Sequence, residues 1–326
     1  MIGTRLTDPH GAWQAAEKQR KELLEKGEKD VPELLPMQEL CEKVESTMTR
    51  MFRQPQNGGN PFLFALTAPK EHELAMELPG CQEFSTAATD GKKFYWNPFF
   101  LSKMDRDELP VVMEHEGYHV IFFHPTRMTS ADPDARNWAM DYVVNSFIEK
   151  DHKDQGRKNK LWNGNLGQPW SLQALLDYID AKAEKPNGDL MFADVSLYGR
   201  PPESIYNEIM EHLEKSPRRC PECGALSIDP KTGKPTKGPC SNRPDCEHKG
   251  QCCPHCGAEL NGKGSGLGDG MPSPLDSHID SRASKQEVQS DVARAAQTAQ
   301  QMRGTVPSHI EEFLGEIHAR ISAHFA

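Results

Sequence analysis

The sequence predicts an α+β fold in which helices and a small mixed sheet form the main domain. Three observations predict it. Apolar residues recur at helical spacing along several segments. Two short apolar runs flank Asp90-Gly91, a strong signal for a β-hairpin turn. Seven of the nine cysteines gather in a segment poor in apolar residues, which indicates a separate module inserted into this domain.

Shifts in composition divide the 326 residues into five predicted parts. From residue 216 the chain becomes rich in Pro, Gly, Lys and Cys, and GKGSGLGDGMPSP then has the composition of a flexible linker. The parts are an N-terminal peripheral helix over 1–35, the main domain over 36–215, a cysteine-rich insertion over 216–262, the linker over 263–275 and a C-terminal helical return over 276–326.

Composition and charge exclude several classes of protein. The formal charge is -10, from 48 acidic against 38 basic residues, which argues against a protein that coats nucleic acid. No apolar run approaches the roughly 18 residues of a membrane span, and the first residues lack a basic-then-apolar signal sequence. We therefore expect a cytoplasmic protein with no membrane partner. In that compartment, clustered cysteines indicate metal ligands.

Periodicity and capping signals predict the order of elements. Apolar residues at helical spacing from Met37 to Met51, with Cys41 as a small hydrophobe among them, give one helix a core-facing stripe. Asp132 and Pro133 open a later helix as its N-cap and first residue. The predicted helices cover 11–30, 36–54, 107–123, 132–149, a short segment capped by Ser171, 204–215, 284–303 and 308–323, and the predicted strands are a buried run over 61–69 and a hairpin within 84–97.

His115, Glu116 and His119 form an HExxH pattern inside the apolar helix that Asp105 or Asp107 caps. Histidines four residues apart lie on one helix face, so both imidazoles can bind one zinc ion. Glu116 is placed beside them to take a proton from water and pass it to a leaving amine. Buried polar side chains are costly unless a metal or other partners satisfy them, and the alternative is a pair of histidines hydrogen-bonded in the core.

Two further questions about this pattern are the role of its glycine and the identity of the third protein ligand that a catalytic zinc needs. Gly117 costs helix stability, which suggests close approach of another backbone or a substrate. His124 is the nearest candidate ligand, but five residues past His119 turns it about 140° off the ligand face if the helix continues. The next helix offers Asp141, with Asn137 and Asn145 four residues to either side as orienting amides. Asp141 is therefore the predicted third ligand and His124 the runner-up.

Several segments together resemble a bacterial and phage family of putative metallopeptidase domains, often joined to a von Willebrand A-like C-terminal domain. They are FYWNPFFL, DELPVVMEHEGYHVIFFHPTR, NWAMDYVVN, YGRPPESIYNEIM, LDSHID and GTVPSHIEEFL. The resemblance covers most of 37–215 and 272–316. It implies a zincin-like fold, a zinc-dependent peptidase activity, a bacterial or phage-infected cytoplasm and an ATPase or other protein as partner.

The resemblance also bears on the C-terminal part of the chain. The sequence ends at HARISAHFA, where longer relatives continue into the von Willebrand A-like part, so we expect any function of that part to be absent. His278 lies in the LDSHID segment. It could return to the active site to bind metal or steady the tetrahedral intermediate, or it could be an exposed turn residue.

The cysteine-rich insertion has the spacing of a zinc ribbon. Two CxxC knuckles, separated by 29 residues, can close a tetrahedral structural zinc site. The first site would use Cys220, Cys223, Cys253 and Cys256, and a second zinc could use Cys240, Cys246, Cys252 and His248. Those three remaining cysteines could instead be reduced thiols. The predicted cofactors are therefore one catalytic Zn²⁺ and one or two structural Zn²⁺ ions.

The prediction for function is a zinc-dependent peptidase that hydrolyses peptide bonds of a protein or peptide substrate. We also expect strand 92–97 to pair with an extended substrate as a sheet edge. One alternative is a non-catalytic adaptor that keeps the fold as a docking surface. The other is a nucleic-acid-associated, SprT-like protease, because nine basic and five acidic residues lie within 215–263. The absence of an aromatic residue there argues against base stacking.

Overall fold

The computed structural model describes residues 6–7, 9–53, 59–78, 85–129, 131–154, 166–180, 182–183, 190–215 and 283–301. These residues fall into two compact units. The first unit comprises Met1–Thr129, Ile148–Asn165 and Leu275–Ala326, and the second comprises Ser130–Phe147 and Leu166–Pro274. The mixture of helices with a small mixed sheet confirms the predicted α+β class.

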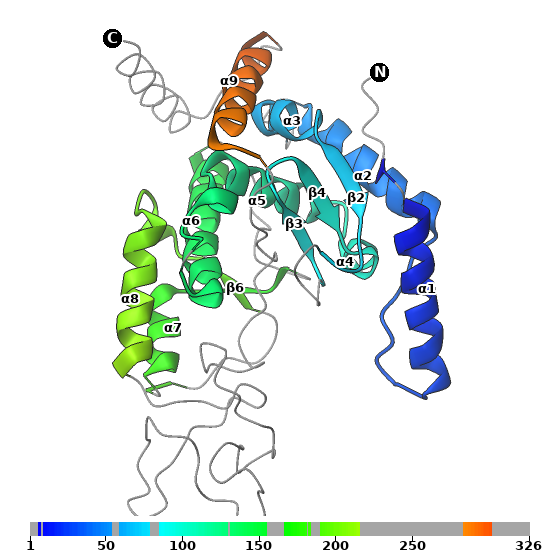
Figure 1. Cartoon of the computed structure of the whole chain (residues 1–326), viewed down its shortest axis with the longest axis horizontal. Helices are drawn as coiled ribbons and strands as arrows, with labels where there is room; N and C mark the ends of the chain where they lie inside the picture. Colours follow the sequence, from blue (N-terminus) through cyan, green and yellow to red (C-terminus); the bar gives the residue numbers. More distant parts are fainter. Residues whose placement is uncertain are drawn as a thin grey trace, which may run out of the picture. The chain divides into compact units, whose positions relative to one another are not determined.

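The first unit contains a four-stranded mixed sheet (Figure 1). Its strands are β1 (Leu6–Thr7), β2 (Glu71–Leu74), β3 (Ala87–Thr89) and β4 (Lys93–Trp96), in the order β1-β2-β4-β3. The predicted hairpin is confirmed, because β3 and β4 are antiparallel and Asp90 Oδ1 accepts hydrogen bonds from the backbone N–H groups of Lys92 and Lys93. Gly91 supplies the positive φ of 85° that this turn requires.

The register of β4 contradicts the prediction that strand 92–97 is a free sheet edge. β4 pairs with β3 on one side and in parallel with β2 on the other. The local pattern did not reveal β2, whose four residues EHEL carry only one aliphatic side chain. Among the strands that the structure describes, β3 is an edge instead.

Several helices lie wholly within the first unit. They are α1 (Pro9–Glu25), α2 (Met37–Met51), α3 (Pro61–Thr67), α4 (Pro98–Lys103), α5 (Leu109–Ile121), the 3₁₀ turn η2 (His124–Thr126) and α9 (Lys285–Gln301). The stripe predicted for α2 is buried at Leu40, Val44, Met48 and Met51. Cys41 is only half-buried, and the pKa of its thiol is raised mainly by desolvation.

The predicted buried strand over 61–69 was wrong, because this run forms helix α3. Asn60 caps it, accepting a hydrogen bond from the Leu63 backbone N–H at 3.1 Å, and Pro61 occupies its first position. The run PFLFALT is apolar at almost every position, so its periodicity does not distinguish a buried strand from a buried helix.

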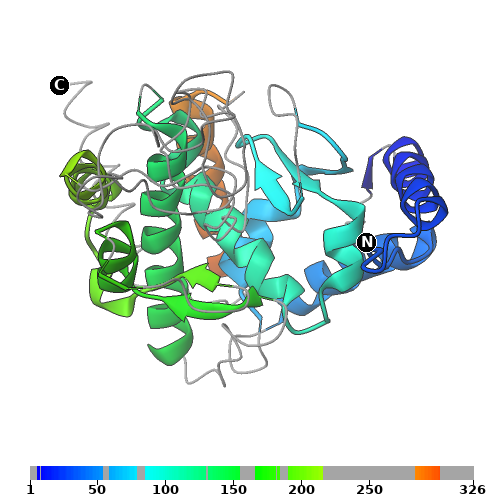
Figure 2. The ribbon, with the colours of Figure 1, turned by 90° about the horizontal axis from the view of Figure 1, so that it is seen from below.

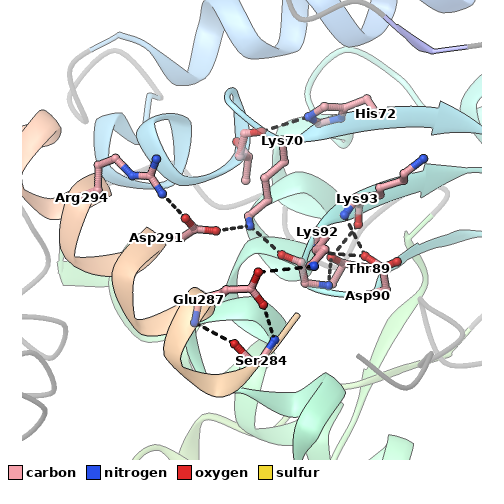
Figure 3. A network of polar contacts seen from close by, with 12 residues as sticks. Lys70, His72, Thr89, Asp90, Lys92, Lys93, Ser284, Glu287, Asp291 and Arg294 are labelled. Carbon is pink, nitrogen blue, oxygen red and sulfur yellow. Dashed lines mark hydrogen bonds and ion pairs between the residues drawn. The ribbon is translucent and has the colours of Figure 1, made fainter. Parts of the chain in front are cut away.

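Helix α9 returns the chain to the first unit and packs against α3 (Figure 1). The network in Figure 3 fixes it there, with the Lys70 ammonium 2.8 Å from the Asp291 carboxylate and donating to the Gly91 carbonyl at 2.6 Å. Lys92 pairs with Glu287 at 3.4 Å on the same side. The Lys70 side chain is only 7% exposed, so this contact is largely shielded from water.

The second unit has its own small core. Strands β5 (Gln168–Trp170) and β6 (Leu190–Phe192) pair in parallel, side by side in light green in Figure 2. The unit also contains helices α7 (Leu172–Ile179) and α8 (Pro202–Lys215) and the 3₁₀ turn η4 (Val195–Leu197). The predicted Ser171 cap is confirmed, since its hydroxyl accepts from the Ala174 N–H. The rings of Trp138, Tyr142, Trp170, Tyr178 and Phe192 pack together in this core.

Helix α6 (Pro133–Asp154) contributes to both units, changing from the second to the first between Phe147 and Ile148. Its predicted start is confirmed, because the Asp132 carboxylate accepts from the Ala135 N–H at 3.0 Å. Among the described residues, no helix is both long and apolar enough to cross a membrane.

Several predicted features lie outside the described residues: the cysteine-rich insertion, the linker, His278 and the helix over 308–323. The division into five parts, the zinc ribbon and the von Willebrand A-like association stay predictions.

Candidate metal centre

Helix α5 begins with a reciprocal cap that fixes the start of the HExxH helix. The Asp105 carboxylate accepts from the Glu108 N–H at 2.8 Å, and the Glu108 carboxylate accepts from the Asp105 N–H at 2.9 Å. Asp105, one of the two predicted caps, therefore caps the turn that leads into α5, whereas the residue directly before the helix is Glu108. Pro110 follows in the first turn, where its missing N–H is tolerated. All thirteen residues of α5 are buried, including its histidines and glutamates.

His115 and His119 direct the same ring nitrogen toward each other. Their Nε2 atoms are 3.0 Å apart, and both residues are 0% exposed. Two nitrogens bound to one tetrahedral zinc at about 2.0–2.1 Å would be about 3.3–3.4 Å apart. A shift of a few tenths of an ångström would therefore let one metal ion join both rings.

Glu116 lies between these histidines in the sequence and is 0% exposed. Gly117 beside it marks a close contact with α3. A Cβ atom at this position would lie 2.9 Å from Leu63 Cδ2 and 3.5 Å from Thr67 Cγ2. The sequence suggested that another backbone or a substrate approaches Gly117, but the nearest atoms are instead side-chain atoms of α3.

Asp141 is the predicted third ligand, and it too is 0% exposed. One ligand atom from each of His115, His119 and Asp141 lies within 4.8 Å of the others. Two imidazole nitrogens and a carboxylate oxygen form a donor set that fits zinc and other first-row metals. The three residues are thus a buried group that could hold a metal ion.

The two amides predicted to flank Asp141 differ in their surroundings. Asn145 is fully buried, and its Nδ2 donates to the Phe192 carbonyl at 2.8 Å within the second unit. Asn137 is only half-buried. The burial of Asp141 and Asn145 argues against the alternative of a polar face exposed to solvent.

His124, the runner-up ligand, contacts a different atom of the pair. The helix does not continue to it, because Phe123 has a left-handed φ of 59° and His124 begins the turn η2. Its Nδ1 lies 2.9 Å from the Nδ1 of His119, not from the Nε2 that faces His115. His124 is 2% exposed, so this contact is buried.

A second buried cluster on α5 was not foreseen from the sequence. One carboxylate oxygen of Glu114 lies 2.5 Å from Nε2 of His152, a residue near the end of α6. The other oxygen accepts a hydrogen bond from Asn60 Nδ2 at 3.4 Å. Both members of the pair are buried. The available signal was a single carboxylate in the apolar run just before His115, but nothing local indicated its partner 38 residues away.

Comparison with protein families agrees with this arrangement. The family described as a putative metallopeptidase domain matches residues 72–321, which is more than half of the chain and includes α5 and α6. No curated protein and no solved structure matches the chain. The family's description indicates hydrolysis of peptide bonds with the help of a metal. On this match, the chain belongs to the putative metallopeptidase domain family.

Proposed function

We propose that this protein is a zinc-dependent peptidase whose metal is held by His115, His119 and Asp141. The observation that carries the proposal is the convergence of three buried donor atoms within 4.8 Å of one another. The HExxH motif on α5 supports the proposal, because Glu116 directly follows the proposed ligand His115 in the sequence. Membership in a metallopeptidase family supports the same reaction class.

A zinc ion in this site would polarise the carbonyl of a peptide bond and make a water molecule more acidic. Glu116 would accept the proton of the attacking water on its carboxylate and then donate it to the amine nitrogen of the leaving group. Burial of Glu116 excludes bulk water from this proton transfer.

Glu116→Gln tests the proposed chemistry. The amide has the size of the carboxylate but cannot take the proton, so we expect hydrolysis of an unfolded protein substrate to fall by about 10²–10⁴-fold. Zinc per chain should stay at the wild-type value, because Glu116 is not a proposed ligand. Glu22→Gln is the control, because Glu22 is exposed on α1 and outside the proposed site, and this variant should keep the wild-type activity.

The adaptor alternative predicts a different result. An adaptor uses the fold as a docking surface, so Glu116→Gln would leave its biological activity intact. Wild-type protein that holds zinc at this site and hydrolyses none of a broad panel of peptides would favour the adaptor.

A further inference from the structure

The turn after α5 brings His124 back onto the HExxH helix. If the helix had continued, His124 would point about 140° away from His119. Instead, Phe123 takes a left-handed conformation, which is strained for a bulky side chain. The result is an Nδ1–Nδ1 distance of 2.9 Å between His124 and His119, with both rings buried.

This contact determines where the protons lie if His119 binds metal through Nε2. A neutral imidazole carries one proton, so His119 must then carry it on Nδ1 and donate it to His124. Nδ1 of His124 must accept that hydrogen bond, and the proton of His124 must lie on its own Nε2. A metal bound at Nε2 would therefore fix the direction of this hydrogen bond, with His119 as the donor and His124 as the acceptor.

We propose that His124 is a positioning residue that orients His119 and is not itself a metal ligand. This rests on the proposed metal site. Nδ1 of His124 contacts Nδ1 of His119, whereas the other nitrogen of the His119 ring, Nε2, faces His115. A hydrogen-bond partner of this kind holds the ligand ring in place and raises its affinity for the metal.

Three full-length variants test the proposal through zinc affinity. His124→Phe keeps an aromatic ring but removes the acceptor, whereas His124→Asn places Oδ1 close to the position of Nδ1. His124→Leu repeats the loss of the acceptor if the Phe variant does not fold. Zinc per chain is measured over a series of chelator-buffered free zinc concentrations, and the zinc lost in His119→Ala identifies the HExxH site.

We expect His124→Phe to raise the free zinc needed for half-occupancy by about 10–100-fold. His124→Asn should stay close to wild type, and every variant should still fill the site at saturating zinc. Wild-type affinity in the Phe variant would overturn the inference, and so would an equal loss in the Asn variant. A site that neither variant fills at saturating zinc would make His124 a ligand instead. If wild type and His119→Ala hold equal zinc, the proposed metal site itself is wrong.

Discussion

Buried histidines on β2 and on α5, both in the first unit, differ in what their ring nitrogens face. His72, on β2, accepts a hydrogen bond from Trp96 Nε1 at 3.2 Å and makes its other contact with the Thr67 carbonyl at 3.2 Å. His115 and His119, on α5, bring their Nε2 atoms to within 3.0 Å of each other. All three are 0% exposed, so burial does not distinguish them.

The difference shows how a structural histidine can be told from a candidate ligand. The partners of His72 are one donor and one acceptor, which suit a neutral ring with its proton on Nε2. Burial lowers the pKa of His72 to about 4, which keeps this ring neutral. The nitrogens of His115 and His119 converge with a carboxylate oxygen, as the ligands of one ion do. We therefore expect substitution of His72 to alter stability, and substitution of His115 or His119 to alter metal content.

The Glu114–His152 pair offers the largest expected effect on stability. Its side chains are 3% and 8% exposed, and removing one member leaves a buried charge or polar group without its partner. We expect His152→Leu to lower the free energy of unfolding by about 3–5 kcal/mol, measured by denaturant titration. Zinc per chain should be unchanged in the folded variant.

The control for this prediction is His212→Ala, because His212 pairs with Asp180 but is 31% exposed. Its effect should be much smaller. Loss of the HExxH zinc from the folded His152→Leu variant would show that the Glu114–His152 pair is needed for metal binding as well as for stability.

The pH dependence of stability sharpens the comparison at His72. The folded pKa is about 4 and the unfolded value about 6.5, so the unfolded chain takes up the proton first as the pH falls. The contribution of His72 is therefore complete above pH 6.5 and decreases toward pH 4, by about 3 kcal/mol in all. The difference in stability between wild type and His72→Gln should change with pH over this window. A difference that is constant with pH would contradict the assignment.

Lys70 should have a smaller effect, because the Asp291 carboxylate is 29% exposed and can regain water. Lys70→Ala removes this ion pair and the hydrogen bond to the Gly91 carbonyl. We expect a loss of about 1–3 kcal/mol in the free energy of unfolding, measured by thermal or denaturant unfolding. Lys18→Ala is the control, since its pair with Glu22 is exposed and should contribute little. If both substitutions lower the free energy of unfolding equally, the conclusion that Lys70 holds α9 in place is wrong.

Much of the first unit could be predicted from local signals. The HExxH helix, its cap at Asp105 and the hairpin at Asp90-Gly91 depend on neighbours a few residues apart, which a sequence displays directly. The error at 61–69 had a local remedy, because Asn60 followed by Pro61 is a helix-start signal. Strand β2 and the Glu114–His152 contact depend on partners about 20 and 38 residues away, which no local pattern reveals.

The most direct test of the metal site is zinc per chain in three folded proteins, measured by elemental analysis in zinc-replete buffer. They are wild type, His119→Ala and His72→Gln. We predict that His119→Ala holds one zinc fewer than wild type, because it lacks a ligand. His72→Gln should hold the wild-type amount, because the ring nitrogens of His72 bond to protein atoms. Equal zinc in all three proteins would contradict the metal site on α5.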